Sequence, residues 1–232
     1  MNSDKFLDYF KRIETFLNLT QRHDDSFVHK INSSNNKAVR FFAEELKFYA
    51  RLRNAIVHNP KENNKAIAEP HSSTVQRLIE IHDKITKPKR LIPIFQVPVF
   101  GAHEEDYIND ILVQMKKYSF SQFPLFDNKE RVVELISTNT IARWISTQLE
   151  DSGTIMIEKV KVKDFIKEIE YPHNYRFIDR DASIYDAHDC FMDEINENKK
   201  NLDVLFITET GKPSEAILGL VTIEDIVLQM EV

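Results

Sequence analysis

Apolar residues in the first ninety positions recur at intervals of three and four residues. One stripe over residues 4–18 consists of Phe6, Phe10, Ile13 and Leu17. A further stripe begins after Pro70, with Ser72 or Ser73 as its cap, and consists of Val75, Leu78, Ile79, His82 and Ile85. This spacing places apolar side chains on one face of a helix and is typical of amphipathic helices that pack against each other.

Between these two stripes the spacing predicts a longer helix. Its apolar positions are Val39, Phe42, Leu46, Tyr49 and Ile56. We expect it to end at His58-Asn59-Pro60, because proline disfavours helical backbone in the residue before it. Residues 1–86 are therefore predicted to form an all-α domain of at least three helices.

After a basic, proline-containing link at residues 87–92, short apolar strands alternate with helices. FQVPVF, a helix through Tyr107 and Met115, FPLF, VVELI and a helix from Thr138 to Leu149 give a β-α-β-β-α unit over residues 93–150. A connecting segment, 151–174, leads to a second copy over residues 175–232, with the strands YRFI, DVLFIT and AILGLVT. The predicted fold class is α+β and multidomain.

The segment AILGLVTIEDIV carries the most informative chemistry, because a strand runs into a helix through Thr222-x-x-Asp225. A helix N-terminus offers free N–H groups to a phosphate, and a carboxylate accepts hydrogen bonds from two ribose hydroxyls. In the alternative interpretation Thr222 and Asp225 form a capping box that serves only their own helix. The first copy has Ser137 and Thr140 at the equivalent positions, and neither supplies a carboxylate.

Composition changes this picture in three ways. With 42% hydrophobic and 29% charged residues, the chain is expected to be globular and soluble, with enough apolar content for a core. The chain has a single cysteine, a polar N-terminal stretch and no apolar run of about 18 residues. These features predict a cytoplasmic protein that does not cross a membrane.

The charge differs between the two halves of the chain. Residues 1–90 hold 17 Lys and Arg against 11 Asp and Glu, whereas the remainder holds 14 Lys and Arg against 26 Asp and Glu. The basic half suits a polyanion or docking onto the acidic half.

Arg53 interrupts the apolar stripe of the long helix. A guanidinium there needs a carboxylate, water or an anionic ligand. Candidate ion-pair partners are Glu44, Glu45, Asp24 and Asp25. Asn54 and His58 share a helical face, but Arg53 and His58 diverge by roughly 140°, so we expect convergence on one phosphate to be easier across two chains.

The residues RLRNAIVHNP, with Arg53, Asn54 and His58, resemble the Arg-Asn-x-x-x-His motif of the HEPN (higher eukaryotes and prokaryotes nucleotide-binding) family. The resemblance covers about residues 1–86 and implies an all-α domain that dimerises. Many members are metal-independent ribonucleases, and others are binding modules. The resemblance implies that His58 acts as the acid or base, that Arg53 binds the phosphate and that Asn54 orients these groups.

Residues 93–232 resemble a pair of CBS (cystathionine β-synthase) domains, called a Bateman module. GLVTIED matches the family's Gly-h-x-Thr-x-x-Asp signature, and FSQFPLFD resembles its opening half. The resemblance implies a site for an adenosine nucleotide (AMP, ADP or ATP), with Thr222 on phosphate and Asp225 on ribose. Ser137 and Thr140 mark a weaker site, and Phe177 and Ile178 are expected among the walls.

Three functions remain open from the sequence. The first is a nucleotide-sensing regulatory protein, in which an adenine nucleotide is the regulatory ligand and no cofactor is required. The second is a HEPN endoribonuclease that acts on RNA and is gated by the CBS pair. The third is a non-catalytic structural or adaptor protein. We expect a homodimer and no metal site, because the histidines lack the spacing of metal ligands.

Overall fold

The computed structural model describes residues 1–19, 25–58, 68–153, 157, 159–198 and 202–231. The chain divides into two compact units. One comprises Met1–Lys89 together with Ser183–Asp189, and the other comprises Arg90–Ala182 together with Cys190–Val232. Helices and small sheets both occur, which confirms the predicted α+β class.

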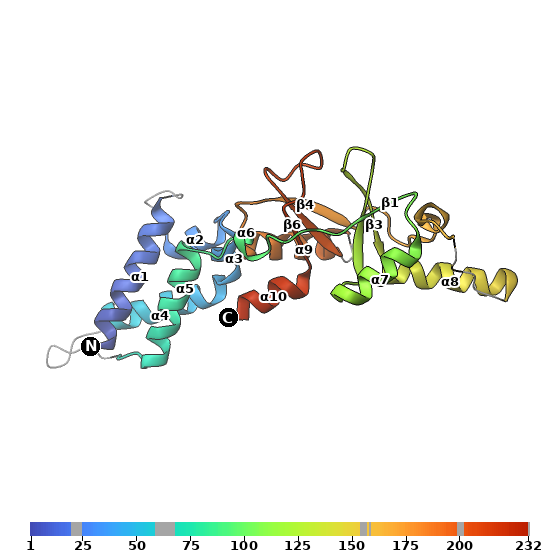
Figure 1. The fold of residues 1–232 in the computed structure, drawn as a ribbon. Helices are drawn as coiled ribbons and strands as arrows, with labels where there is room; N and C mark the ends of the chain where they lie inside the picture. Colours follow the sequence, from blue (N-terminus) through green and yellow to red (C-terminus); the bar gives the residue numbers. More distant parts are fainter. Residues whose placement is uncertain (20–24, 59–67, 154–156, 158, 199–201, 232) are drawn as a thin grey trace. The chain divides into compact units, whose positions relative to one another are not determined.

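All regular elements described in the first ninety residues are helices (Figure 1). They are α1 (Asn2–Asn18), α2 (Phe27–Asn32), α3 (Lys37–Phe41), α4 (Ala43–His58) and α5 (Ser72–Thr86). The stripe on α1 is buried as predicted, with Phe6 and Ile13 both 0% exposed. The sequence missed α2, a single short segment that Ser26 caps by accepting a hydrogen bond from the His29 amide.

The predicted long helix is two helices. The backbone leaves helical geometry at Phe42, which follows α3 and precedes α4. Phe42 is only 3% exposed, so the break keeps its ring in the core. Helix α5 begins one residue earlier than expected, with His71 rather than a serine as its N-cap. The end of α4 at His58 is described, whereas Asn59 and Pro60 lie outside the described residues.

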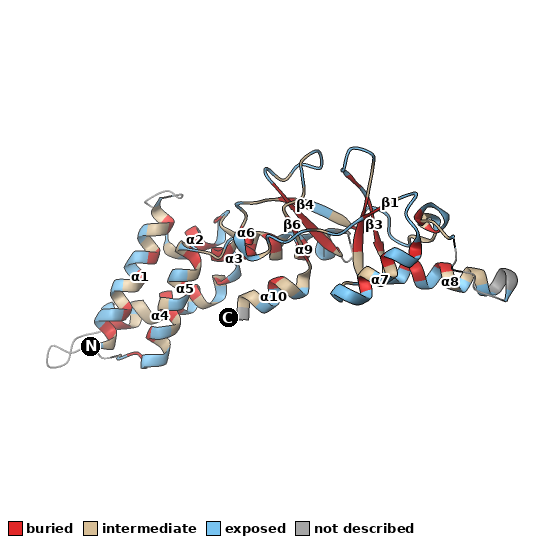
Figure 2. Ribbon diagram, viewed as in Figure 1, coloured by how far each residue is buried: buried red, intermediate tan, exposed pale blue. Residues whose placement is uncertain are grey.

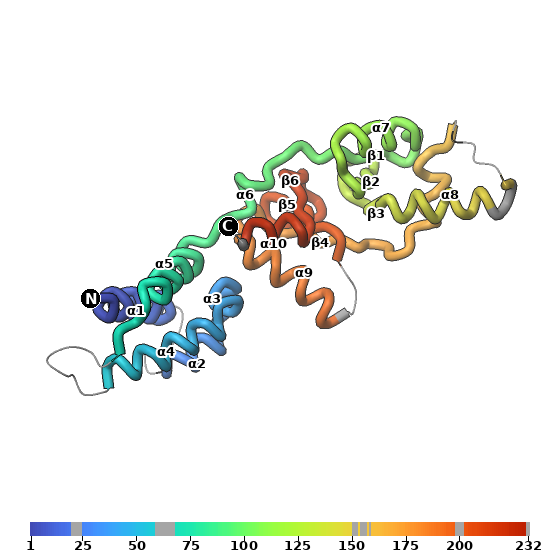
Figure 3. Tube along the Cα trace, turned by 90° about the horizontal axis from the view of Figure 1, so that it is seen from below, coloured from blue at the N-terminus to red at the C-terminus, as the bar shows by residue number. Residues whose placement is uncertain are grey.

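The first residues of α9 (Ile184–Asn198) belong to the helical unit. Tyr185 is 2% exposed, and its ring centroid lies 5.4 Å from that of Phe41 and 5.7 Å from that of Phe42. Burial raises the pKa of Tyr185 to about 12. Lys37 forms an ion pair with Asp189 one turn further along. Figure 3 shows α9 as one continuous helix, so it is shared between the two units.

The second unit contains two halves with the same element order. The first half consists of β1 (Ala102–His103), α7 (Ile108–Tyr118), β2 (Gln122–Phe126), β3 (Val132–Ser137) and α8 (Thr138–Ser152). The second half consists of β4 (Tyr175–Asp179), α9, β5 (Val204–Thr208), β6 (Gly219–Val221) and α10 (Ile223–Glu231). Helix α6 (Leu91–Ile94) precedes the first half, and the 3-10 turns η1 (Val162–Asp164) and η2 (Ile166–Glu168) lie between the halves.

Each half has a three-stranded sheet, in the order β1-β2-β3 or β4-β5-β6. The first two strands of each sheet run parallel and the last two antiparallel. The central strand β5 is buried at every position, and Figure 2 shows buried residues along both sheets. The apolar run that forms β5 suits a strand covered on both faces.

The segment that precedes each half packs against the third strand of the other half. Gln96 forms an antiparallel bridge to Gly219 on β6, and a Cβ on Gly219 would lie 1.9 Å from the Phe95 carbonyl oxygen. Glu134 holds the same register position on β3 as Gly219 does on β6. The Glu134 carboxylate accepts a hydrogen bond of 2.8 Å from the backbone amide of His173. This reciprocal packing ties the two halves together.

Candidate functional site

Thr222 and Asp225 form a capping box at the start of α10. Strand β6 ends at Val221 and α10 begins at Ile223, so Thr222 is the turn between them. The backbone amide and the hydroxyl of Thr222 each donate to Asp225 Oδ2 over 2.9 Å. The amide of Asp225 donates to Thr222 Oγ1 over 3.4 Å. The capping interpretation therefore accounts for one oxygen of the carboxylate.

The cap does not use the other oxygen of Asp225, and Asp225 is one of the residues that line a cleft. Within the described part of the chain, Asp225 Oδ1 accepts no hydrogen bond. This cleft has a volume of about 280 Å³, and the full set of its lining residues is Ser119, Phe120, Ser121, Gln122, Pro124, Leu135, Val204, Leu220, Thr222 and Asp225. Both halves of the unit supply walls. Asp225 thus both caps α10 and lines the cleft.

The hydroxyl of Thr222 is not available in the role that the resemblance implies. A hydroxyl group has one proton, and that of Thr222 is donated to Asp225 Oδ2. Contact with a phosphate oxygen needs this donor. In the observed geometry Thr222 therefore orients Asp225 and does not offer its hydroxyl proton to a ligand.

Phe177 and Ile178 are not among the residues that line the cleft beside Asp225. Both residues lie on β4, and β5 separates β4 from β6 in the sheet. Thr222 follows β6 and consequently lies at the opposite edge. The ring of Phe177 packs against that of Phe206, with the centroids 5.8 Å apart. The alternation of apolar residues along YRFI indicated a strand but did not show on which edge of the sheet it lies.

Ser137 and Thr140 form the equivalent capping box in the first half. The amide of Thr140 donates to Ser137 Oγ over 3.3 Å, and the amide of Ser137 donates to Thr140 Oγ1 over 3.4 Å. Thr140 is 3% exposed, and neither residue is among those that line the cleft beside Asp225. The structure therefore does not bring this pair together with Thr222 and Asp225.

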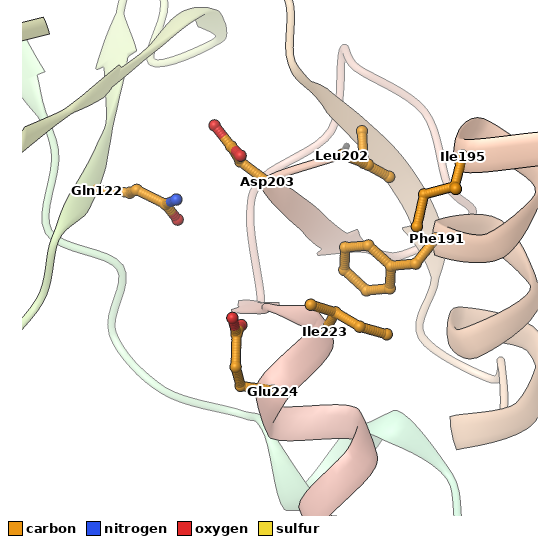
Figure 4. Close-up of a pocket in the computed structure, with 7 residues that line it drawn as sticks. All are labelled: Gln122, Phe191, Ile195, Leu202, Asp203, Ile223 and Glu224. Atoms are coloured by element: carbon orange, nitrogen blue, oxygen red, sulfur yellow. The ribbon is translucent and has the colours of Figure 1, made fainter. Parts of the chain in front are cut away.

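A second cleft, also of about 280 Å³, was not expected from the sequence (Figure 4). It is lined by Gln122, Phe191, Ile195, Leu202, Asp203, Ile223 and Glu224, and it shares Gln122 with the first cleft. In Figure 4 the carboxylates of Asp203 and Glu224 lie between Gln122 and the apolar side chains of Phe191 and Ile195. The only indication of this second cleft in the sequence was that Asp203 and Glu224 lie close to the ends of strands in the second half.

Arg53, Asn54 and His58 lie together at the end of α4. Arg53 Nη1 donates to Asn54 Oδ1 over 3.2 Å and lies 3.4 Å from His58 Nε2. The expected divergence of Arg53 and His58 is therefore wrong, because the long arginine side chain spans the angle between their backbone positions.

The alternative ion pairs of Arg53 do not form among the described residues. Glu44 pairs with Lys47 instead, and Glu45 pairs with Arg77. Of the remaining two candidates, Asp25 lies near His29, and Asp24 lies outside the described residues. Asn54 and His58 are exposed, so the group faces solvent.

Two searches of the described residues bear on other sites. No cluster of three or more His, Cys, Asp or Glu residues there has the arrangement of a metal site. No described helix has the length and apolar character that crossing a membrane requires.

No family model matches the sequence, and no curated protein matches it. Solved structures with some similarity include the CBS-domain pair of protein MJ0100 in complex with 5′-methylthioadenosine and S-adenosyl-L-methionine. It is 16% identical, with a TM-score of 0.42 over 62% of this chain and 97% of that chain.

Two further similar structures come from named organisms. The CBS domain of a membrane protein from Sphaerobacter thermophilus is 12% identical, with a TM-score of 0.45 over 66% of this chain and 94% of that chain. Protein MJ1225 from Methanocaldococcus jannaschii is 14% identical, with a TM-score of 0.44 over 78% of this chain and 63% of that chain. Similarities at this level assign neither a function nor a ligand to the chain.

Proposed function

We propose that residues 93–232 form a CBS-type pair that binds an adenosine-containing ligand and regulates the helical unit. The observation that carries the proposal is the state of the Asp225 carboxylate. Its Oδ2 is held by the amide and hydroxyl of Thr222, its Oδ1 is not used by the cap, and Asp225 lines a cleft of about 280 Å³. A carboxylate oriented in this way is prepared to accept hydrogen bonds from a ribose.

The walls of the cleft suit a nucleoside. Phe120, Pro124, Leu135, Val204 and Leu220 supply apolar surface, and Ser119, Ser121 and Gln122 supply neutral hydrogen-bonding groups. Small-molecule sites combine an apolar lining with a few placed polar groups. A purine ring has apolar faces and polar edges, so it matches this combination, whereas the ribose diol matches Asp225.

Helix α9 provides a route from the ligand to the helical unit. Phe191 and Ile195 on α9 line the second cleft, which shares Gln122 with the first. Tyr185, which precedes Phe191 on the same helix by less than two turns, is packed into the helical unit against Phe41 and Phe42. A ligand that favours one position of α9 therefore favours one packing of the helical unit, because it binds the two arrangements with different affinity.

Calorimetry with adenosine, AMP, ADP and ATP tests the proposed binding. The matched variant is Asp225→Asn, whose amide oxygen can keep the hydrogen bonds of the cap while its NH₂ group replaces Oδ1. We expect the wild-type protein to bind at least one of these compounds and Asp225→Asn to bind it at least tenfold more weakly, since a hydrogen bond to a charged group contributes about 1.5–3 kcal/mol. Absence of binding by the wild-type protein would reject the proposal.

A second candidate function is a metal-independent endoribonuclease, and one observation favours it. Arg53, Asn54 and His58 converge within one chain, and Arg53 has no carboxylate partner among the described residues. A guanidinium and an imidazole side by side suit a phosphodiester, because one binds phosphate and the other transfers protons near neutral pH. The test is RNA cleavage in the presence of a chelator by the wild-type protein and by His58→Ala. Equal cleavage by both proteins would exclude this chemistry.

A further inference from the structure

A third cleft, of about 290 Å³, is lined by both hairpin turns of the second unit. The turn from β2 to β3 supplies Lys129, Glu130 and Arg131, and the turn from β5 to β6 supplies Ser214 and Glu215. The residues that line this cleft are distinct from those that line the two clefts beside α10. Sites for small molecules typically measure about 300–1,000 Å³, so the third cleft suits a small ligand.

The turn from β2 to β3 is organised around the carboxylate of Asp127. Its Oδ1 accepts hydrogen bonds from the amides of Lys129 and Arg131 over 2.8 and 3.0 Å. Its Oδ2 accepts from Arg131 Nε over 2.9 Å and from Arg131 Nη2 over 2.5 Å. These hydrogen bonds from Arg131 lower the pKa of Asp127 to about 2. A guanidinium has five N–H donors, so Arg131 is held in one orientation and keeps donors for a ligand.

The same turn therefore gives the cleft a cationic wall. Lys129 adds a second positive charge, because the network around Asp127 uses only its backbone amide. Glu130 is acidic, and its carboxylate lies 3.2 Å from Nε2 of His103. The ammonium of Lys129 and the fixed guanidinium of Arg131 are the groups on this wall that suit a carboxylate.

The turn from β5 to β6 presents a fixed carboxylate. Glu215 Oε1 accepts a hydrogen bond of 2.5 Å from the hydroxyl of Thr210. Its Oε2 accepts from the amides of Thr210 and Lys212 over 2.7 and 3.4 Å. The hydrogen bond from the Thr210 side chain is the main reason why the pKa of Glu215 is lowered to about 2, so Glu215 is ionised at neutral pH. A carboxylate offers about four acceptor positions, so one remains for a ligand.

Apolar side chains complete the cleft. They are Val99, Phe126, Ala216 and Ile217. Phe126 and Ile217 also pack against a buried cluster to which both halves contribute. An apolar group in the cleft would therefore rest on side chains that are held by the core.

We propose that this third cleft binds a free α-amino acid with an apolar side chain. Such a molecule has a carboxylate for Lys129 and Arg131, an ammonium group for Glu215 and an apolar chain for the remaining surface. A ligand that lacks one of these charges leaves one wall without an opposite charge, so complementarity favours the zwitterion. The site is separate from Asp225, and the inference does not rest on the proposed binding of an adenosine derivative.

Calorimetry with leucine, isoleucine, valine and methionine tests the proposal. We expect the wild-type protein to bind at least one of them with a Kd of about 1 mM or tighter. The acid and the amine that correspond to this amino acid are then titrated, which for leucine are 4-methylpentanoate and 3-methylbutylamine. Each should bind at least about fivefold more weakly than the amino acid, the loss expected for one exposed ion pair.

Two variants assign the charges to residues. Lys129→Met keeps the amide that bonds Asp127 and should weaken the amino acid by about three- to fivefold without weakening the amine. Glu215→Gln keeps an oxygen for the Thr210 amide and should weaken the amino acid to a similar extent without weakening the acid. The matched control is Lys116→Met, an exposed residue that does not line the cleft, and it should leave all affinities unchanged.

The outcomes separate this site from the one at Asp225. If none of the four amino acids binds the wild-type protein, the proposal is overturned, whatever the result with adenosine. If the acid or the amine binds as tightly as the amino acid, the matching of both charges is overturned. Equal affinities of Lys129→Met and Lys116→Met would show that the amino acid does not bind in this cleft.

Discussion

Replacement of Gly219 by alanine tests the packing that joins the two halves of the second unit. The new Cβ would lie 1.9 Å from the Phe95 carbonyl oxygen and 3.1 Å from the Phe95 carbonyl carbon. Both atoms belong to the backbone, so no side-chain rotation relieves the overlap. The Phe95–Gln96 segment must move by about 1 Å or more, because protein interiors are close-packed. The bridge between Gln96 and Gly219 is then lost.

The expected destabilisation follows from two contributions. Overpacking costs about 1–3 kcal/mol, and loss of the bridging hydrogen bonds costs about 1 kcal/mol more. A chain of this size loses roughly 2–4 °C of melting temperature per kcal/mol. We therefore expect Gly219→Ala to lower the melting temperature of the second unit by about 5–15 °C.

Tryptophan fluorescence provides the assay, because Trp144 is the only tryptophan and is 3% exposed in the core of the first half. Gly153→Ala is the matched control. Gly153 has a φ of +67° at the end of α8, and apart from its chain neighbours no atom of the described residues lies within 4 Å of its Cβ position, so the control carries only a backbone cost of about 1 kcal/mol. If Gly219→Ala melts no lower than Gly153→Ala, the reciprocal packing of the halves is refuted.

Two further predictions concern ionisation and packing. Hydrogen bonds from Lys161 and Lys163 lower the pKa of Glu105 to about 2, so its carboxylate should titrate near pH 2 by NMR. Its stabilising contribution is present above the unfolded pKa of about 4.5 and is lost as the pH falls toward 2. Exchange of both lysines for methionine should raise the midpoint, and an unchanged midpoint contradicts the contact. Tyr185→Phe should leave helical-unit stability nearly unchanged, whereas Tyr185→Ala should reduce it by about 3–5 kcal/mol in chemical denaturation. Equal stability of the two variants would contradict the packing of α9.

The sequence predicted those features that depend on local periodicity. The stripe that contains Phe6 and Ile13 identified α1, because burial of one helix face requires apolar residues three and four positions apart. The repeated element order was also visible, since each half combines short apolar strands with amphipathic helices. The first strand was misplaced, because FQVPVF is not a strand and β1 (Ala102–His103) follows it. The predicted equivalence of Ser137 with Thr222 is matched by the strand register, in which Ile136 on β3 holds the position that Val221 holds on β6.

Features that depend on contacts between distant segments could not be predicted. Phe177 was expected beside Asp225, yet strand order places it at the other edge of its sheet, and an apolar pattern contains no information on strand order. Gln122 and Glu224 meet at one cleft although about a hundred residues separate them. The sequence also could not show whether capping and ligand binding exclude each other at Asp225, because that depends on which carboxylate oxygen the cap uses.

The most direct test of the account measures the coupling between Asp225 and the ribose diol. Binding of adenosine and of 2′,3′-dideoxyadenosine is compared in the wild-type protein and in Asp225→Asn. We expect removal of the hydroxyls to cost the wild-type protein about 1.5–3 kcal/mol of binding free energy and the variant much less, because only the wild-type protein has a carboxylate oxygen to accept them. An equal loss in both proteins would show that Asp225 does not hold the ribose and would contradict the account.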